Sequence, residues 1–146
     1  MDILPMSVIQ LREGFEGQDM FVIPRPILSQ AATHPLVRSA YPTDIGWFPN
    51  AAHHFRERVD GARQDHLIMC VAGHGYAVIA DQKTHLSAGE LLIIPRGVPH
   101  RYWAADDAPW STYWVHFLGD DADYYVGRIR GTNQRVRCGL RQNGPR

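Results

Sequence analysis

Histidine is the residue of this sequence with the widest chemical range, because imidazole ligates metals and exchanges protons near neutral pH. Catalytic zinc or iron usually takes three protein ligands. The side chains available for that role are His53, His54, His66, His74, His85, His100 and His116. No two of them form a His-x-His pair. No metal-ligand spacing is therefore evident from these residues alone.

Covalent catalysis has no visible basis in the sequence. Ser87, Ser111 and Cys70 lack a motif-level partner that would activate them as nucleophiles. The glycines of Gly73-x-Gly75 are too few for a nucleotide-binding fingerprint, which also requires a strand followed by a helix. We predict that the chain is not an enzyme and that it needs no cofactor.

Short segments rich in β-branched and aromatic residues fill the chain from Arg38 onward, separated by Gly, Pro and Asp. This pattern is typical of all-β domains, and the segments are too short for helices. They predict strands at residues 39–42, 45–48, 54–58, 66–71, 76–80, 83–86, 91–94, 101–104 and 112–118. Asp81 and Gln82 are expected to form a tight hairpin turn. The last strand has apolar residues on both faces, which favours a barrel or a two-sheet roll.

The two ends of the chain differ from this pattern. Residues 1–35 show no sustained helical period, and we predict an arm with one or two short strands. Residues 120–125 could begin a helix. From Gly127 onward the chain is polar, glycine-rich and aperiodic, so we expect disorder there, or a segment borrowed by a neighbouring chain.

A length of 146 residues with 45% hydrophobic and 21% charged residues indicates one globular domain. All fifteen acidic residues lie in the first 123 positions together with nine of the fifteen basic ones, a balance of −6. An acidic folded part is unsuited to binding nucleic acid by itself. The arginines after Asp123 have no helical period or interleaved aromatics, so we interpret them as a soluble end.

Nothing in the sequence indicates a membrane or a secretory route. There is no run of about 18 apolar residues, and the N-terminus lacks the basic and apolar regions of a signal peptide. We predict a cytoplasmic protein with no membrane partner. Cys70 stands in an apolar segment and Cys138 in a polar tail, so we expect reduced thiols.

Residues 89–100 read Gly-Glu-Leu-Leu-Ile-Ile-Pro-Arg-Gly-Val-Pro-His. This order of glycine, five residues, proline, one residue, glycine, two residues and histidine resembles the second motif of the cupin family. Gly89 turns the chain into a buried strand, Pro95 ends that strand, and Gly97 allows a tight reversal before His100. The motif normally closes with an asparagine four residues after the histidine, where this sequence has Ala104.

Residues 66–75, which read His-Leu-Ile-Met-Cys-Val-Ala-Gly-His-Gly, resemble the end of the first cupin motif. The metal-binding His-x-His pair that precedes this end in the family is absent from the stretch 58–64. His66 stands where the family has a glutamate. Of all the histidines, only His66 and His100 therefore fall at positions that match metal ligands of the family. Two imidazoles without the His pair or a carboxylate make a poor site, so the resemblance implies no bound metal. We interpret His100 as an inward-facing histidine that lines a pocket or is satisfied by hydrogen bonds.

The wider pattern from about His34 to Gly119 is similar to the sensor domain of AraC-type transcription regulators. Its most specific part is Pro109-Trp110 followed by Tyr-Trp-x-His-Phe at residues 113–117. The resemblance implies a jelly-roll-like cupin barrel that holds a small effector, an N-terminal arm able to close over it, and following helices that dimerise the subunits. We therefore expect an arm at 1–35, a cupin effector-binding domain at 36–119, and a partial helix or poorly ordered basic tail at 120–146.

The resemblance also implies partners. A small-molecule effector such as a sugar is expected in the barrel, and a second copy of the chain is expected in a homodimer. AraC-type regulators bind DNA through a helix-turn-helix domain, which these 146 residues do not include. We expect DNA as a partner only through such a domain.

Site contacts at Arg58, Tyr102 and Trp114 are implied by alignment with the arabinose-binding member of the family. Their chemistry agrees, since a Trp face stacks on a sugar ring, a Tyr hydroxyl gives and accepts hydrogen bonds, and Arg offers planar donors to hydroxyls or a carboxylate. Thr112 stands where that relative has a histidine. The predicted ligand-binding set is Arg58, His66, His100, Tyr102, Thr112 and Trp114. The alternative is that Trp114 is an ordinary core aromatic and Arg58 a solvated rim residue.

Three functions are compatible with these patterns. The first is the ligand-sensing and dimerisation domain of an AraC-type regulator, which binds a sugar or sugar acid. The alternative is a metal-dependent cupin enzyme, such as an isomerase or dioxygenase, and its ligands would have to include His66 and His100. A third is a module that acts only through dimerisation or another protein contact.

Overall fold

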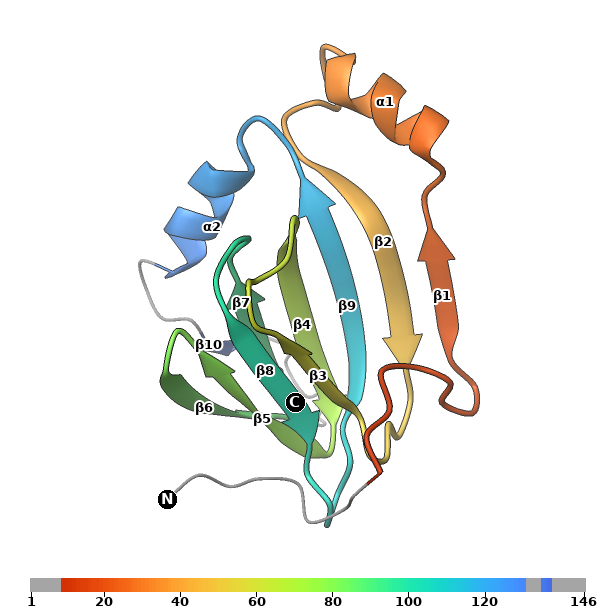
Figure 1. Cartoon of the computed structure of the whole chain (residues 1–146), viewed down its shortest axis with the longest axis vertical. Helices are drawn as coiled ribbons and strands as arrows, with labels where there is room; N and C mark the ends of the chain where they lie inside the picture. The colour runs from red at the N-terminus through yellow and green to blue at the C-terminus, as the bar shows by residue number, and fades with distance from the viewer. Residues whose placement is uncertain (1–8, 131–134, 138–146) are drawn as a thin grey trace, which may run out of the picture.

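Two antiparallel β-sheets face each other and enclose the core of the protein (Figure 1). The computed structural model describes residues 9–130 and 135–137. The larger sheet has the strand order β1 (Asp19–Val22), β2 (Tyr41–Phe48), β9 (Ser111–Leu118), β4 (Asp65–Ala72), β7 (Glu90–Ile94) and β10 (Arg135–Arg137). The smaller sheet has the order β3 (Phe55–Arg58), β8 (His100–Ala104), β5 (His74–Ile79) and β6 (Gln82–Ser87). The all-β barrel predicted from the sequence is confirmed.

The predicted strands are present with small changes at their ends. The segments 39–42 and 45–48 belong to one strand, β2, in which an irregularity between Pro42 and Asp44 shifts the pairing with β9 without ending it. The hairpin between β5 and β6 turns at Ala80 and Asp81, one residue earlier than predicted. Their φ angles of 47° and 67° match the left-handed turn that suits the twist of two paired strands.

The core lies between the inner faces of the two sheets. Trp110, Cys70, Leu86 and Leu92 have no exposed surface. Gly75 lets the Trp110 ring lie directly on β5, because a Cβ at this position would come 2.2 Å from Trp110 Cε3. Among the described residues, Cys70 is a buried free cysteine, and Cys138 lies outside them.

The N-terminal arm contains a helix that the sequence did not predict. Helix α1 (Arg25–Thr33) follows Pro24 and carries a second proline in its first turn, where the fixed φ suits a helix and no intrahelical bond is lost. None of its residues is buried, which explains why no apolar period was visible. Residues 9–18 lie at the other end of the barrel (red in Figure 1), where the Leu11 N–H donates to the His53 carbonyl at 2.8 Å.

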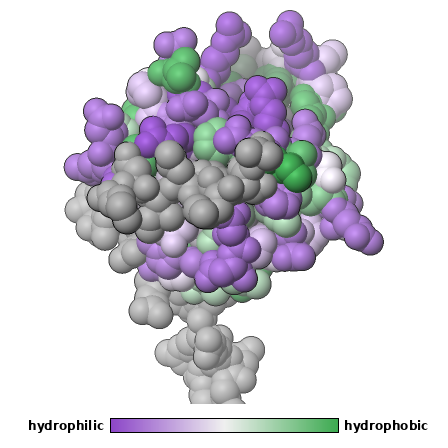
Figure 2. All heavy atoms as spheres, turned by 60° about the horizontal axis from the view of Figure 1, so that its bottom comes forward, coloured by the Kyte–Doolittle hydropathy of each residue, from purple (hydrophilic) through white to green (hydrophobic). Residues whose placement is uncertain are grey.

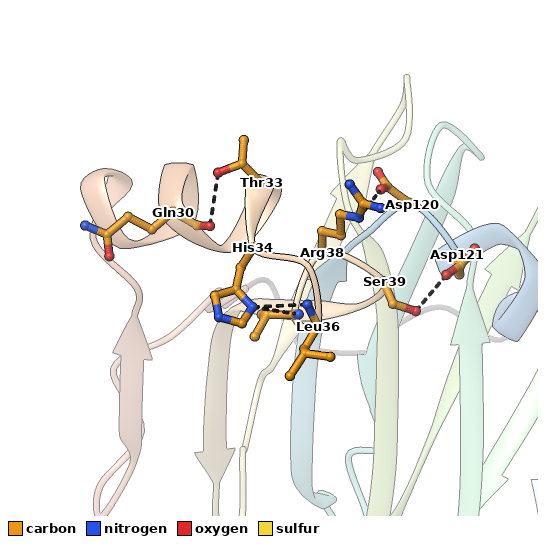
Figure 3. Close-up of polar contacts among 9 residues, drawn as sticks. Gln30, Thr33, His34, Leu36, Arg38, Ser39, Asp120 and Asp121 are labelled. Carbon is orange, nitrogen blue, oxygen red and sulfur yellow. Dashed lines mark hydrogen bonds and ion pairs between the residues drawn. The ribbon is translucent and has the colours of Figure 1, made fainter.

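A polar junction ties the segment after α1 to the end of β9 (Figure 3). The Arg38 guanidinium lies 3.7 Å from the Asp120 carboxylate, and the Ser39 hydroxyl donates to Asp121 at 2.7 Å. The backbone N–H groups of both aspartates donate to the carbonyls of Arg38 and Ser39. Gly119 permits this approach, because a Cβ there would lie 2.2 Å from the Ser39 carbonyl oxygen. The start of β2 and the end of β9 are therefore held together.

The C-terminal part has more regular structure than the sequence indicated. Helix α2 (Ala122–Arg130) begins within the segment that suggested a helix and continues past Gly127. Ala122 and Val126, one helical turn apart, are buried. Arg135–Arg137 form β10 on β7, where no strand was predicted. The rest of the predicted tail, residues 131–134 and 138–146, lies outside the described part of the chain.

Among the described residues, no helix is long and apolar enough to cross a membrane. Figure 2 shows the end of the barrel that lies at the bottom of Figure 1, where hydrophilic side chains cover most of the visible coloured surface. Exposed apolar side chains are found on the outer face of the larger sheet, at Phe21, Ile45 and Tyr113.

Candidate functional site

A cavity of about 130 Å³ lies between the two sheets. Its lining comes from both sheets and from the arm, and consists of Arg12, Glu13, Met20, Asp44, Phe48, His54, Arg56, Arg58, Ile68, Tyr102, Thr112, Trp114 and His116. Four of the six side chains predicted to bind a ligand are in this lining, namely Arg58, Tyr102, Thr112 and Trp114. His66 and His100 lie behind it. The structure thus brings these residues together, and their contact with a ligand stays a prediction.

Strands β3 and β8 form one wall of the cavity. Arg56 and Arg58 are two residues apart on β3, so both side chains point inward. In the antiparallel register Arg56 pairs with Tyr102, and Arg58 pairs with His100. Arg58 Nη1 donates to His100 Nε2 at 3.0 Å and to the Tyr102 hydroxyl at 3.3 Å. One Arg58 nitrogen thus makes both bonds, and the other donors of its guanidinium have no hydrogen-bond acceptor within the described chain, which suits them to a ligand.

Strand β9 forms the opposite wall through Thr112, Trp114 and His116, which share its inner face by alternation. Thr112 is only 1% exposed. Within the described part of the chain, neither Thr112 Oγ1 nor Trp114 Nε1 has a hydrogen-bond partner, although both atoms are buried. A buried polar atom without a partner is costly, so these two atoms are suited to hydrogen bonds with a bound molecule.

Gly46 on β2 makes room for the Trp114 indole across the strand pair. A Cβ at Gly46 would lie 2.3 Å from Trp114 Cζ2, which is far inside van der Waals contact. We expect Gly46→Ala to displace the indole into the cavity and to lower the free energy of unfolding by about 1–3 kcal/mol, the usual cost of overpacking. Urea unfolding measures the loss, and near-ultraviolet circular dichroism reports the changed tryptophan environment.

Gly127→Ala in α2 is the matched control, because a Cβ there meets nothing within 4 Å. We expect it to be neutral or slightly stabilising, since Ala is the better helix former. Equal unfolding free energies in the Gly46→Ala variant and the wild type would show that the indole does not depend on the space above Gly46.

A row of polar side chains on the larger sheet includes Asp44 and His116 of the cavity lining. His116 Nδ1 lies 2.8 Å from Asp44 Oδ2, and the Thr43 hydroxyl donates to Asp44 Oδ1 at 2.7 Å. Burial alone would raise the pKa of Asp44, but these hydrogen bonds outweigh it and lower the pKa. The His66 ring stacks on His116 with 3.5 Å between ring centroids. Both oxygens of Asp44 are therefore engaged within the protein.

His66 and His100 are uncharged members of this region. Burial, together with nearby His116 and Arg58, lowers the pKa of His66 far below its ordinary value. Burial also lowers the pKa of His100, against the effect of its hydrogen bond to the Val98 carbonyl. That bond uses Nδ1 of His100, so its Nε2 accepts from Arg58. His100 thus orients the Arg58 guanidinium toward the cavity.

His54 closes the floor of the cavity next to the core. Its Nδ1 accepts a hydrogen bond from Trp110 Nε1 at 3.0 Å. Burial, with the positive charges of Arg56 and Arg58, lowers the pKa of His54 to about 3. His54 is therefore neutral at physiological pH, and its imidazole acts as an acceptor for the core tryptophan.

Sequence reasoning missed several residues of the lining. Arg56 and His116 could have been found by strand alternation from Arg58 and Trp114. Asp44 sits one residue before a predicted strand, and the bulge in β2 places it inside. Arg12 and Glu13 reach the cavity from the arm, and no local signal in the sequence could have shown that.

The sequence pattern that describes the AraC-like ligand binding domain matches residues 49–145, more than half of the chain. The chain belongs to this family. The matched range contains β3, β8 and β9, the strands that form the two cavity walls. The resemblance to AraC-type sensor domains that the motifs indicated is thus confirmed. Much of the cavity lining belongs to the matched range.

Curated relatives of this AraC-like domain are regulators of operons. The MmsAB operon regulatory protein of Pseudomonas aeruginosa is 35% identical over 108 residues, which cover 70% of this chain and 34% of that protein. The raffinose operon transcriptional regulatory protein RafR of Pediococcus pentosaceus is 31% identical over 67 residues, 46% of this chain and 24% of that protein. The chain spans about a quarter to a third of the length of these relatives.

Solved structures similar to this domain include cupins. The cupin domain of Cnp3 from Schizosaccharomyces pombe covers 78% of this chain and 69% of its own, at 12% identity and a TM-score of 0.46. Oxalate decarboxylase of Bacillus subtilis covers 62% of this chain and 24% of its own, at 17% identity and a TM-score of 0.43. These proteins are too distant to bear on function.

A metal at the cupin ligand positions does not fit the residues present. His100 Nε2, which would have to ligate the ion, accepts a hydrogen bond from the Arg58 guanidinium at 3.0 Å. The positively charged guanidinium occupies the position next to Nε2 that a metal ion would need, and the two positive charges would repel each other. Among the described residues, no group of three or more His, Cys, Asp or Glu side chains is arranged to hold a metal ion.

Proposed function

We propose that this AraC-like domain is the effector sensor of a transcription regulator and binds a small polar molecule, such as a sugar or sugar acid, in its barrel. The observation that carries the proposal is the pair of buried, unpartnered atoms Thr112 Oγ1 and Trp114 Nε1 in the lining of the cavity. A hydroxylated ligand supplies the partners that these atoms lack. The family of the domain supports the same assignment.

Each predicted side chain has a definite task in this proposal. Trp114 presents the edge of its ring, with Nε1–H, to a ligand oxygen, and Arg58 donates to hydroxyl or carboxylate oxygens. The Tyr102 hydroxyl accepts from Arg58 and can donate to the ligand. Thr112 supplies a hydroxyl from the opposite wall. His100 positions Arg58 through a hydrogen bond, and the His66 ring stacks on His116 and supports it.

The arm couples the cavity to the rest of the regulator in this proposal. Arg12 and Glu13 line the cavity while Leu11 is paired with the backbone at His53 and Phe55. A ligand that contacts the arm stabilises the closed arrangement over any open one, and so shifts the population of the two. We further propose that the regulator is a homodimer, which is supported by its family and is measured by light scattering during size-exclusion chromatography.

We expect Trp114→Ala and Arg58→Ala to abolish the thermal stabilisation that an effector provides. In the wild type, a ligand at ten times its Kd adds about 1.4 kcal/mol, or roughly 4 °C in Tm for a domain of this size. The measurement is a melting-temperature screen against sugars, sugar acids and small aromatics, repeated with both variants. Far-ultraviolet circular dichroism shows that the barrel remains folded.

Tyr113→Ala is the matched control, because Tyr113 neighbours Trp114 on β9 but faces outward and is 54% exposed. Its ligand-induced shift should equal that of the wild type. A shift that persists in both Trp114→Ala and Arg58→Ala would place the ligand elsewhere and refute the assignment of the cavity.

The alternative of a metal-dependent cupin enzyme has one observation in its favour, although the Arg58 guanidinium on His100 Nε2 opposes a metal at that position. Both ring nitrogens of buried His66 lack a hydrogen-bond partner among the described residues, and its ring centroid lies 5.7 Å from that of His100. Elemental analysis of protein purified without a metal-affinity tag separates the two functions. Near-stoichiometric iron, manganese, nickel or zinc would favour the enzyme, and its loss in His66→Asn would locate the metal.

A further inference from the structure

Positive charge prevails in the cavity. Arg12, Arg56 and Arg58 all line it, whereas the acidic residues of the lining are Glu13 and Asp44. Both oxygens of Asp44 are engaged by His116 and Thr43. Glu13 lies on the arm and is exposed. Among the described residues, the lining therefore holds three guanidiniums and two carboxylates, and positive charge exceeds negative charge by one even though Asp44 is ionised.

Arg56 shows this imbalance most clearly. Its Nε atom is buried and has no hydrogen-bond partner within the described residues. Burial and the like charges of Arg58 and Arg12 lower its pKa, although Tyr102 and Glu13 oppose this. A half-buried guanidinium next to two others is destabilising unless an anion accompanies it. The described residues thus supply positive charge at the cavity and leave Arg56 Nε without an acceptor.

The size of the cavity limits what that acceptor can be. An engineered protein cavity of about 150 Å³ takes up benzene, which has six non-hydrogen atoms. The present cavity has a volume of about 130 Å³. It therefore accommodates roughly six non-hydrogen atoms, the size of a carboxylic acid with three or four carbons. A larger acid would have to extend from the cavity toward the arm.

We propose that the effector is a small carboxylate with a hydroxyl group, whose carboxylate lies between Arg56 and Arg58 of β3 and Arg12 of the arm. This inference rests on the proposed sensor function and names its ligand class. A planar carboxylate matches the donor fork of a guanidinium, and Thr112 and Trp114 on the opposite wall bind the hydroxyl group. Because Arg12 belongs to the arm, the anion also ties the arm to the barrel.

The direct test compares acids with neutral analogues of the same size. The probes are acetate, lactate and 3-hydroxybutyrate, matched with acetamide, propane-1,2-diol and butane-1,3-diol. Kd values come from thermal-shift titrations at pH 7.5, with sodium chloride adjusted to constant ionic strength. We expect the hydroxy acids to bind at least about tenfold more tightly than their diols, because hydrogen bonds between ions are roughly twice as strong as neutral ones.

Arg56→Gln removes the central charge and keeps a polar side chain of similar reach. We expect it to weaken lactate and 3-hydroxybutyrate at least about tenfold and to leave the diols within about threefold. Arg25→Gln is the matched control, since Arg25 is exposed at the start of α1 and does not line the cavity. Its Kd for each probe should equal that of the wild type.

Arg12→Gln keeps the test decisive if Arg56→Gln fails to fold, because Arg12 is exposed on the arm. It should weaken the acids several-fold without changing the melting temperature of the free protein by much. In the wild type the hydroxy acids should also slow tryptic cleavage after Arg12, and the diols should not.

The outcomes distinguish this inference from the proposed function. Sugars or diols that bind as tightly as the acids, with the binding lost in Trp114→Ala, would refute the carboxylate and leave the sensor cavity in place. Acids whose affinity is unchanged in both Arg56→Gln and Arg12→Gln would also refute it. If no sugar, sugar acid, small acid or diol shifts the melting temperature, both the carboxylate and the sensor cavity fail.

Discussion

At pH 5 the domain should be about 4 kcal/mol less stable to unfolding than at pH 7.5, because two buried histidines remain unprotonated in the folded state. His54 has its pKa lowered to about 3, and the pKa of His66 is lowered far below its ordinary value of 6.5. In the unfolded chain both bind a proton below pH 6.5. Each then favours unfolding by 1.36 kcal/mol per pH unit, about 2 kcal/mol at pH 5.

The sign depends on which state binds more protons. Between the unfolded pKa of 6.5 and a folded pKa of about 3, the unfolded chain carries the extra protons, so stability rises with pH in this window and is constant above it. His100, with its lowered pKa, adds in the same direction. Urea unfolding at pH 5.0, 6.0 and 7.5 measures the effect, and pH 5 lies above the range in which most carboxylates titrate.

His54→Asn isolates one of these contributions. The Asn side-chain oxygen can accept the hydrogen bond of Trp110 Nε1 but does not titrate, so the stability difference between pH 5.0 and 7.5 should shrink by about 2 kcal/mol. His53→Asn is the neighbouring control. His53 is exposed and has a φ of 64°, a conformation that Asn tolerates, and its replacement should leave the pH dependence intact. A stability independent of pH in the wild type would contradict the neutral histidines.

Trp110→Ala should lower the free energy of unfolding by about 3–5 kcal/mol, the range for removing a large buried aromatic. Trp110 has no exposed surface, packs its ring on Gly75, and donates to His54 Nδ1. The change leaves a void between β5 and the core and an unpaired buried imidazole nitrogen. Urea unfolding with circular dichroism as the readout measures the loss.

Two further variants separate packing from hydrogen bonding in this prediction. Trp110→Phe keeps an aromatic ring and loses the donor, so its cost should be clearly smaller than that of Trp110→Ala. Trp47→Ala makes the same chemical change on the outer face, where Trp47 stacks on exposed Tyr113. Its cost should be smaller than that of Trp110→Ala, and equal costs would show that Trp110 is not the centre of the core.

Much of the fold could be predicted because strands and turns depend on neighbouring residues. The alternation from 112 to 118 indicated β9, and the motif from Gly89 to His100 indicated β7, its end and the start of β8. Helix α1 could not be predicted in this way, because none of its residues is buried and its sequence therefore has no apolar period. Strand β10 depends on pairing with β7 and has no signal in its own three residues.

The candidate site was predictable in part, through the resemblance to a known family. Arg58, Tyr102, Thr112 and Trp114 could be named because they align with sugar-contact positions of an AraC-type relative, and all four line the cavity. Asp44 escaped notice because a bulge sets its direction, and bulges arise from the pairing of two strands. Arg56 could be placed in the lining only once it was known that Arg58, two residues later on β3, points inward.

The order of residues specifies local preferences, which were enough for most strand positions, and its motifs indicated the family and, through it, four members of the cavity lining. Charge inside the cavity is a different kind of property. It arises because the arm crosses the barrel end and brings Arg12 toward Arg56 and Arg58, more than forty positions away in the chain. Distances between such residues depend on how the sheets close, so only the folded chain decides which groups share a small volume and which pKa values they acquire.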